Sequence, residues 1–342
     1  MREANYYQAK AGPDTASPAV GEVAASDPSL YELMVRPWEL INTPLERGEF
    51  GYRMRHLKTP AITLYLEQFD LGCRIRGLSP QNVLVFSVPI HLSSRSTYWK
   101  ASLCDSGFPV MLPGELDVEF GSGQLHLIAL IDLSLLDSHL PPELNDTLKN
   151  VAMAHVLPSS SMAVKRFGNW LLALLDETDR RPHLLQYPAT LQSIEEDLLG
   201  RLADVVGGVQ VPHRATTLSR RRRGFDRALE FFRETDGTSV TITELSEIAG
   251  VSSRTLEYAF RETFDLTPLG FLRLRRLHAA RCELIAADPY RTTVTEIAYR
   301  NGFYHVARFA VSYRQRFAES PSQTLKQQYP YTENELLPLV RG

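Results

Sequence analysis

Cysteine is scarce in this chain of 342 residues, and long apolar runs are missing. Only Cys73, Cys104 and Cys282 occur, too few and too scattered for a disulfide framework or a zinc site with paired ligand spacing. We therefore expect buried free thiols and no bound metal. No run reaches the roughly 18 apolar residues of a membrane-spanning helix. The N-terminus also has no basic segment followed by an apolar one, so we expect a cytoplasmic protein without membrane contact.

Sequence signatures of catalysis are missing too. The chain has no nucleophile elbow, no zincin motif, no glycine-rich phosphate loop and no carboxylate pair of recognisable spacing. We therefore expect no catalytic residue and no cofactor. Function should instead lie in binding.

Charge is unevenly distributed along the chain, whose net charge is −3. Residues 219–328 contain 18 Lys/Arg against 13 Asp/Glu, whereas residues 1–218 contain 18 against 25. A basic segment joined to an acidic one suits a nucleic-acid-binding domain attached to a domain that does not touch nucleic acid. The excess is modest and does not decide the matter alone.

Local patterning divides the chain into five segments. Residues 1–28 are rich in Ala, Pro, Ser and Asp and read as a disordered tail. In 29–206, short runs with period-two alternation precede helical periodicity at 160–176 and 188–206, which predicts an antiparallel barrel or jelly roll with helices. Residues 207–224 read as a linker, 225–330 as an all-helical domain, and 331–342 as a C-terminal tail. The fold class is therefore α+β.

The all-helical domain contains one short pattern twice. The runs 243–256 and 294–309 each place apolar residues before and after a glycine, Gly250 in the first and Gly302 in the second, 52 residues apart. Glycine permits the positive φ of a tight turn, and Ser252 or Ser253 can cap the helix that follows. Two helix-turn-helix units are predicted, each with a second helix suited to the major groove of DNA.

A single helix is predicted between the two units, over residues 268–286. Its 19 residues span roughly 28 Å. Successive major-groove faces of B-DNA are roughly 34 Å apart. A rigid connector of this length can hold two recognition helices in adjacent grooves on one face of a duplex.

The C-terminal motif resembles the DNA-binding domain of AraC/XylS-type transcriptional regulators. The stretch Gly302, Phe303, Arg308, Phe309 and Tyr313, followed by 319–325, is most similar to the branch that contains the ethanolamine-operon regulator. The sequence departs from that branch at Ala307 and Ala318, where glycine is expected. The resemblance implies a cupin-like sensor and dimerisation domain in 29–206, a small-molecule effector, an activator acting on RNA polymerase, and promoter DNA as partner.

The same resemblance, together with the helical pattern, selects the residues that meet DNA. They are Ser253, Arg254, Glu257, Tyr258, Arg261, His305, Ala307, Arg308, Ser312 and Arg314. Arginine reads guanine bidentately and glutamate accepts from cytosine, so the first unit should discriminate sequence. The base-facing positions of the second unit fall on Ala307 and Val311, which can only meet thymine methyls, unless Val311 is buried. Arg308 has the alternative of an internal salt bridge, and the run 220–223 is either a phosphate contact or part of a solvated linker.

Several alternatives stay open in the N-terminal segment. The arginines Arg53, Arg55, Arg74, Arg76 and Arg95 either line a pocket for an anionic effector or lie on the surface. The apolar stripe of 188–206 forms either a homodimer seam or a helix packed on its own barrel. The whole segment could also serve protein–protein contact in an effector-independent regulator. A cupin-type enzyme is a further alternative, although only His56, His91 and His126 are available as metal ligands.

Overall fold

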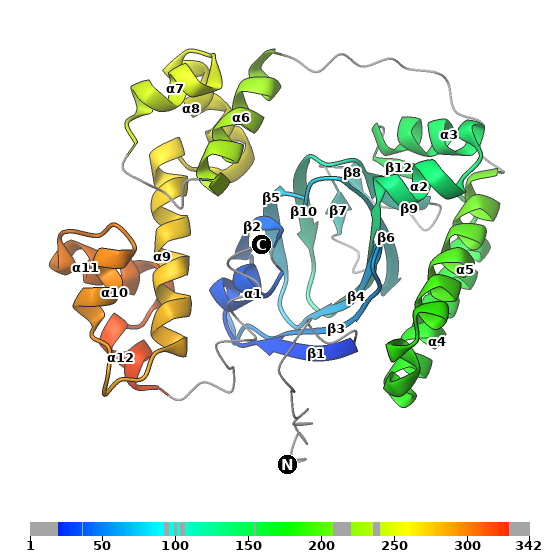
Figure 1. Cartoon of the computed structure of the whole chain (residues 1–342), viewed down its shortest axis with the longest axis horizontal. Coiled ribbons are helices and arrows are strands. Elements are labelled where there is room, and N and C mark those ends of the chain that lie inside the picture. Colours follow the sequence, from blue (N-terminus) through cyan, green and yellow to red (C-terminus); the bar gives the residue numbers. More distant parts are fainter. Residues whose placement is uncertain are drawn as a thin grey trace.

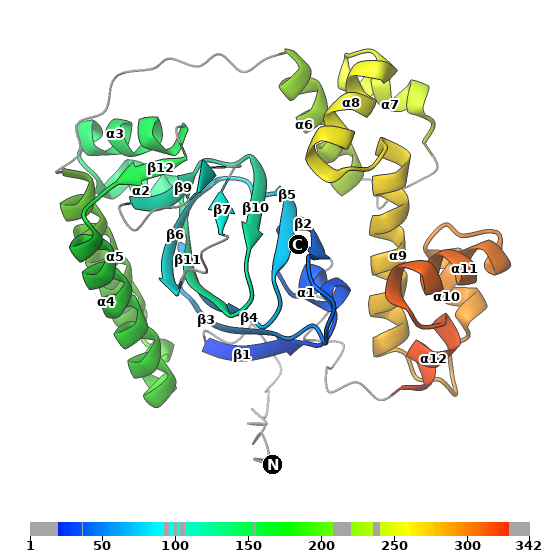
Figure 2. The same ribbon diagram turned by 180° about the vertical axis from the view of Figure 1, so that it is seen from behind.

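The computed structural model describes residues 20–35, 37–91, 96–98, 101–102, 107–153, 155–207, 220–234 and 240–327. Strands dominate the N-terminal part, and the described residues from 220 onward are helical (Figure 1). Helices α4 (Ser161–Arg180) and α5 (Pro188–Gly207) cover one side of the sheets. The C-terminal helices lie on the opposite side, as the reverse view also shows (Figure 2). The α+β fold class is confirmed.

The strands form two antiparallel sheets. The larger sheet has the order β1 (Val20–Ala25), β3 (Tyr52–Lys58), β4 (Ile62–Phe69), β11 (Gln124–Asp132), β6 (Val83–His91), β9 (Gly107–Met111) and β12 (Val156–Pro158). The smaller has the order β2 (Glu39–Pro44), β5 (Cys73–Leu78), β10 (Glu115–Phe120), β7 (Thr97–Tyr98) and β8 (Ala101–Ser102). A closed barrel needs its edge strands to pair. Among the described strands none joins the two sheets, so the predicted barrel is corrected to two open sheets.

Side-chain alternation gives the larger sheet a core on each face. Along β6, Phe86 and Val88 join the cluster that contains Leu171 of α4, whereas Val85 joins the cluster between the two sheets. Successive residues of a strand point to opposite faces, so a strand covered on both sides is apolar throughout its length. The two sheets therefore enclose their own interior while the helices cover the outside.

The apolar stripe of α5 lies in this outer core. Ile194, Leu198 and Leu202 are buried against the chain's own sheet and helices. The alternative of a helix packed on its own domain is therefore the observed arrangement. A dimer seam cannot use the same side chains without unpacking them.

Two predicted boundaries change. Residues 20–28, assigned to a tail, contain strand β1, which pairs with β3, and the first residue of α1 (Pro28–Met34). Valines 20 and 23 are partly buried there, which a compositional argument cannot detect. The linker 207–224 is also corrected at its end, because α6 (Arg220–Glu234) already includes the arginine run. The tail 331–342 lies outside the described residues.

The C-terminal helices form two small cores joined by one helix. The first comprises α6, α7 (Ile242–Ala249) and α8 (Ser253–Phe264), packed around Phe260. The second comprises α10 (Val294–Arg300), α11 (Val306–Phe317) and α12 (Pro321–Lys326), packed around Phe309. Helix α9 (Pro268–Ala286) contributes to both cores and has the bounds that the sequence predicts. Helices α2 (Leu133–His139) and α3 (Pro142–Met153) complete the N-terminal part.

Candidate nucleic-acid interface

Local chemistry fixes the first helix-turn-helix unit. The Thr241 hydroxyl accepts from the backbone N–H of Glu244, whose carboxylate accepts from the backbone N–H of Thr241, a reciprocal cap at the start of α7. Gly250 ends α7 with φ 63°. The Ser252 hydroxyl then caps α8 by accepting from the backbone N–H of Thr255 at 3.2 Å. The direction of α8 is therefore set by short-range contacts that the sequence encodes.

The second unit repeats this construction. Thr293 and Glu296 form the same reciprocal cap at the start of α10. Gly302 adopts φ 75°, and α11 begins one residue after His305, which occupies the N-cap position. Ala318 ends α11 in the left-handed region, with φ 58°. The position where the resemblance expects glycine thus has the backbone conformation that favours glycine.

Helix α8 presents a polar face to solvent. Arg254 and Arg261 are exposed, Tyr258 is 60% exposed and Glu257 is half-buried. Leu256 and Phe260 face the core. Arg254, Tyr258 and Arg261 are thus accessible from solvent, and their contact with DNA stays a prediction.

Ser253 has a different environment from its neighbours on that face. Its hydroxyl donates to the hydroxyl of Ser246 at 3.1 Å and so links α8 to α7. A hydroxyl engaged in this way supports the angle between the two helices. Ser253 is better described as a positioning residue than as a free base contact.

Helix α11 presents a mixed face. His305, Ala307, Arg308 and Arg314 are exposed. Val311 is 58% exposed, so the alternative of a buried valine does not hold. Residues 307 and 311 are four apart and therefore lie on one face of the helix, which can meet thymine methyl groups.

Two residues near that face have their own local contacts. The Ser312 hydroxyl donates to the backbone carbonyl of Arg308 at 2.8 Å and accepts from the guanidinium of Arg273 on α9. In the described part of the chain no ion pair involves the side chain of Arg308, so its guanidinium is available on the surface. The arginine run 220–223 begins α6, and its side chains lie outside the described set.

The arginines considered for an anionic effector lie elsewhere. Arg53 pairs with Asp70, Arg55 with Asp176 and Asp179, and Arg74 with Asp117. The Arg76 guanidinium donates to the backbone carbonyl of Glu262 on α8. None of these four lines the cavity between the sheets, and Arg95 lies outside the described residues. The structure thus engages the four described guanidinium groups in contacts outside the cavity.

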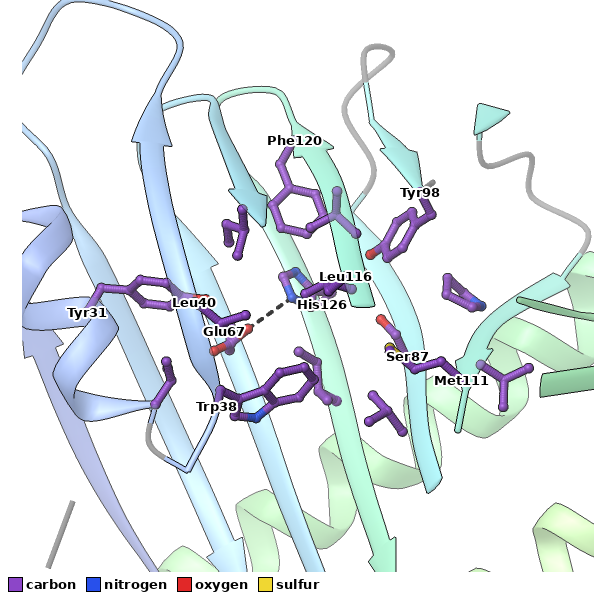
Figure 3. Close-up of a pocket in the computed structure, with 17 residues that line it drawn as sticks. Tyr31, Trp38, Leu40, Glu67, Ser87, Tyr98, Met111, Leu116, Phe120 and His126 are labelled. Atoms are coloured by element: carbon purple, nitrogen blue, oxygen red, sulfur yellow. Dashed lines mark ion pairs between the residues drawn. The ribbon is translucent and has the colours of Figure 1, made fainter. Parts of the chain in front are cut away.

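A cavity lies between the two sheets, lined by 17 residues (Figure 3). Its wall is aromatic and aliphatic, with Tyr31, Trp38 and Phe120 among the largest side chains. One polar pair interrupts this surface, because Nε2 of His126 lies 3.0 Å from Oε2 of Glu67. Glu67 was not among the predicted site residues, because it comes next to His126 only when β4 pairs with β11. Glu67 is a carboxylate on the inward face of β4.

The phenols around the cavity stay in their neutral form. Burial is the largest cause of the raised pKa of Tyr31, Tyr52 and Tyr98, and the Glu67 carboxylate raises each pKa further. The Tyr52 hydroxyl donates to Oε1 of Glu67 at 2.6 Å. The carboxylate therefore receives hydrogen bonds on both oxygens.

Helix α1 joins this cavity to the C-terminal domain. Tyr31 lines the cavity, while the next residue, Glu32, accepts from the guanidinium of Arg316 on α11 and lies 3.2 Å from Nε2 of His278 on α9. The backbone N–H of Asn42 donates to Glu32 as well, at 2.7 Å. Burial raises the pKa of Glu32, and the Arg316 guanidinium acts in the opposite direction.

A second contact lies at the start of the same helix. The Asp27 carboxylate accepts from the backbone N–H groups of Ser29 and Leu30, and from the guanidinium of Arg281 on α9 at 2.9 and 3.0 Å. Arg281 is only 2% exposed and also donates to Glu319 at 3.0 Å. A buried guanidinium is stable only with such partners. Helix α1 and the C-terminal domain therefore form one connected polar interface.

Comparison with known proteins identifies the C-terminal part. The sequence profile described as "Helix-turn-helix domain" matches residues 245–327. Residues 245–327 are a helix-turn-helix domain. Over 87 residues the chain is 42% identical to the "Probable thc operon regulatory protein" of Rhodococcus erythropolis, which covers 25% of this chain and 26% of that protein. Over 101 residues it is 36% identical to the "XylDLEGF operon transcriptional activator 2" of Pseudomonas putida, covering 30% and 64%.

Both alignments cover about a third of this chain or less, and less than two thirds of either relative's length. Among solved structures, a probable AraC family transcriptional regulator from Rhodopseudomonas palustris is 33% identical, with 31% of this chain and 98% of that chain covered and a TM-score of 0.28. The AraC-like transcriptional activator CuxR is 13% identical, with 77% and 96% covered and a TM-score of 0.42. Both TM-scores are too low to establish a shared fold.

Two features are absent from the described residues. No helix there combines the length and apolarity needed to cross a bilayer. No group of three or more His, Cys, Asp or Glu side chains in the described ranges is arranged to hold a metal ion.

Proposed function

We propose that this chain is a sequence-specific DNA-binding transcription regulator of the AraC/XylS type, acting as an activator in the cytoplasm. The observation that carries the proposal is the pair of recognition helices, α8 and α11, built alike and joined by the single helix α9. Each has a solvent-exposed face opposite a buried one. The likeness to named operon regulators supports it. The finer likeness to the ethanolamine-operon branch rests on the C-terminal motif alone.

The two helix-turn-helix units would contact different parts of the DNA. In the first, Arg254 would meet guanine and Glu257 a cytosine amino group, with Arg261 on phosphate. In the second, Ala307 and Val311 would meet thymine methyls. His305, Arg308 and Arg314 would then contact phosphates and set the register of the domain on DNA.

The N-terminal domain would sense a small molecule. Helix α1 supports this idea, because Tyr31 lines the cavity and the adjacent Glu32 contacts Arg316 of the helix-turn-helix domain. Because Glu32 follows Tyr31 directly in the chain, a ligand that moves Tyr31 would also change the contact between Glu32 and Arg316 of the second unit. The ligand would bind two arrangements of the helix-turn-helix domain against the N-terminal domain with different affinity, and so would shift the equilibrium between them.

The same proposal includes a homodimer, but its contact surface differs from the predicted stripe of 188–206. Since the apolar stripe of 188–206 is buried, we place the dimer contact at the outer groove between α4 and α5, lined by residues that include Trp170, Leu174 and Asp197. Sedimentation equilibrium of the purified chain tests this, with Trp170→Glu as the variant expected to give monomers. RNA polymerase is the expected partner of an activator.

The test of DNA binding uses the purified full chain and the DNA upstream of its own gene, across a salt series with excess random duplex as competitor. We expect competitor-resistant binding with a steep salt slope. Arg254→Ala should weaken specific binding by about 1–3 kcal/mol and leave non-specific binding unchanged.

Arg261→Ala is the matched control on the same helix. Loss of a phosphate contact should weaken both kinds of binding alike and lower the salt slope by about one unit. Equal losses for both variants on both kinds of DNA would remove Arg254 from base reading. Binding no tighter to upstream DNA than to random duplex, with or without cell metabolites, would refute the regulator proposal.

A further inference from the structure

The cavity between the sheets has a size that limits what it can hold. The space open to the centre of a water molecule measures ≈ 40 Å³. Surrounded by the radius of a water molecule, a compact region of that size corresponds to roughly 150–200 Å³, similar to a cavity that accommodates benzene. A ligand of about the size of a six-membered ring therefore fits without rearrangement of the wall.

The ring of His126 places a polar atom without a partner in the wall. His126 is 1% exposed, and its Nδ1 has no hydrogen-bond partner among the described residues. Because Nε2 faces the Glu67 carboxylate at 3.0 Å, Nε2 carries the proton and donates it. In the neutral ring Nδ1 is then an acceptor. An imidazolium would instead bury a second N–H without an acceptor.

Charge decides against an anionic ligand. Among the described residues that line the cavity there is no lysine or arginine, and the neutral ring of His126 adds no positive charge to balance the Glu67 carboxylate. A ligand carboxylate would lie near Glu67 without a counter-ion, and burying an unpaired charge is strongly unfavourable. Apart from the hydroxyl groups of Tyr31, Ser87 and Tyr98 and the Trp38 indole, the wall is apolar, so most of the ligand must be apolar as well.

We propose that the cavity binds a small uncharged molecule, mostly apolar and about the size of a six-membered ring, that donates one hydrogen bond from an O–H or N–H group to Nδ1 of His126. This ligand is the effector of the regulator proposed above. Its binding is measured without DNA, so failure here is distinguishable from failure of the DNA-binding proposal.

The experiment uses the full chain and four probes of matched size. Phenol and cyclohexanol carry the donor, anisole lacks it, and benzoate replaces it with a negative charge. Titration is followed by calorimetry and by the fluorescence of the tryptophans, of which Trp38 lines the cavity. We expect saturable binding of one phenol or cyclohexanol per chain, at least 10-fold weaker binding of anisole, and no binding of benzoate.

Variants at one lining residue locate the binding. Val118 lies on β10 and is buried in the wall. Val118→Phe fills the space and should abolish phenol binding, whereas Val118→Ala enlarges it and should retain binding. Both variants are first compared with the wild type by thermal melting, and the probe comparison on the wild type stands even if Val118→Phe fails to fold.

The outcomes separate cleanly. Benzoate that binds as tightly as phenol overturns the exclusion of anions. Anisole that matches phenol overturns the role of Nδ1 as acceptor. Absence of saturable binding by both phenol and cyclohexanol, or phenol binding that survives in folded Val118→Phe, overturns the site itself.

Discussion

Ala318 tests whether a left-handed backbone conformation strains the end of α11. It ends α11 with φ 58° and ψ 6°, a left-handed conformation. An L-residue is strained there by about 1–2 kcal/mol. Glycine avoids the strain but loses about 0.5–1 kcal/mol more than alanine in chain entropy on folding. The difference predicts that Ala318→Gly stabilises the folded chain by about 0.5–1 kcal/mol.

Thermal melting of the full chain, followed by far-UV circular dichroism, measures this effect. A rise in Tm of about 2–4 °C per kcal/mol is expected for a domain of moderate size. Ala310→Gly is the matched control, since the same chemical change inside α11 should lower stability by about 1 kcal/mol. Equal losses for both variants would refute the strain at position 318.

Three further predictions concern other contacts. Arg281→Ala removes a buried guanidinium that has two carboxylate partners, so it should lower the free energy of unfolding in urea by about 3 kcal/mol. The control Arg300→Ala removes a surface ion pair and should lower it by less than about 1 kcal/mol in the same measurement. Burial raises the pKa of Cys73 to about 12, so iodoacetamide at pH 8 should leave it unmodified until the chain unfolds, as peptide mass spectrometry reports. The backbone N–H and hydroxyl of Thr241 lower the pKa of Glu244 below 4.5. The stability that these hydrogen bonds contribute is present above pH 4.5 and is lost as pH falls through the lowered pKa, so the Tm difference between wild type and Thr241→Ala should shrink in acid. Modification of Cys73 before unfolding would contradict the second prediction, and a Tm difference that does not change with pH would contradict the third.

Much of the helix-turn-helix domain could be predicted because its determinants are local. A cap, a turn glycine and an apolar stripe lie within about ten residues of one another, as at Thr241, Gly250 and Leu256. Helix α9 was predicted with its observed bounds for the same reason, since Thr267 caps it and Pro268 begins it. Such signals are independent of the rest of the chain.

The cavity and the interface of α1 could not be predicted, because they depend on contacts between distant residues. Glu67 meets His126 only after β4 pairs with β11. Arg281 meets Asp27 across 254 residues of sequence. Strand alternation correctly puts Arg74 and Arg76 on one face but does not say which face is inside. The partner Asp117, on the neighbouring strand β10, decides that for Arg74.

The continuity of α9 has a consequence for the DNA that this chain can recognise. Each residue of an α-helix advances the axis by about 1.5 Å and turns it by about 100°. Inserting one residue into α9 would therefore turn α11 to another side of the helix, and inserting four would nearly restore its side but move it by about 6 Å, nearly two base pairs. Helix α9 consequently fixes both the distance between α8 and α11 and their relative rotation about its axis. If both helices read DNA as proposed above, a binding site whose two halves are separated by one extra base pair would no longer fit both helices at once.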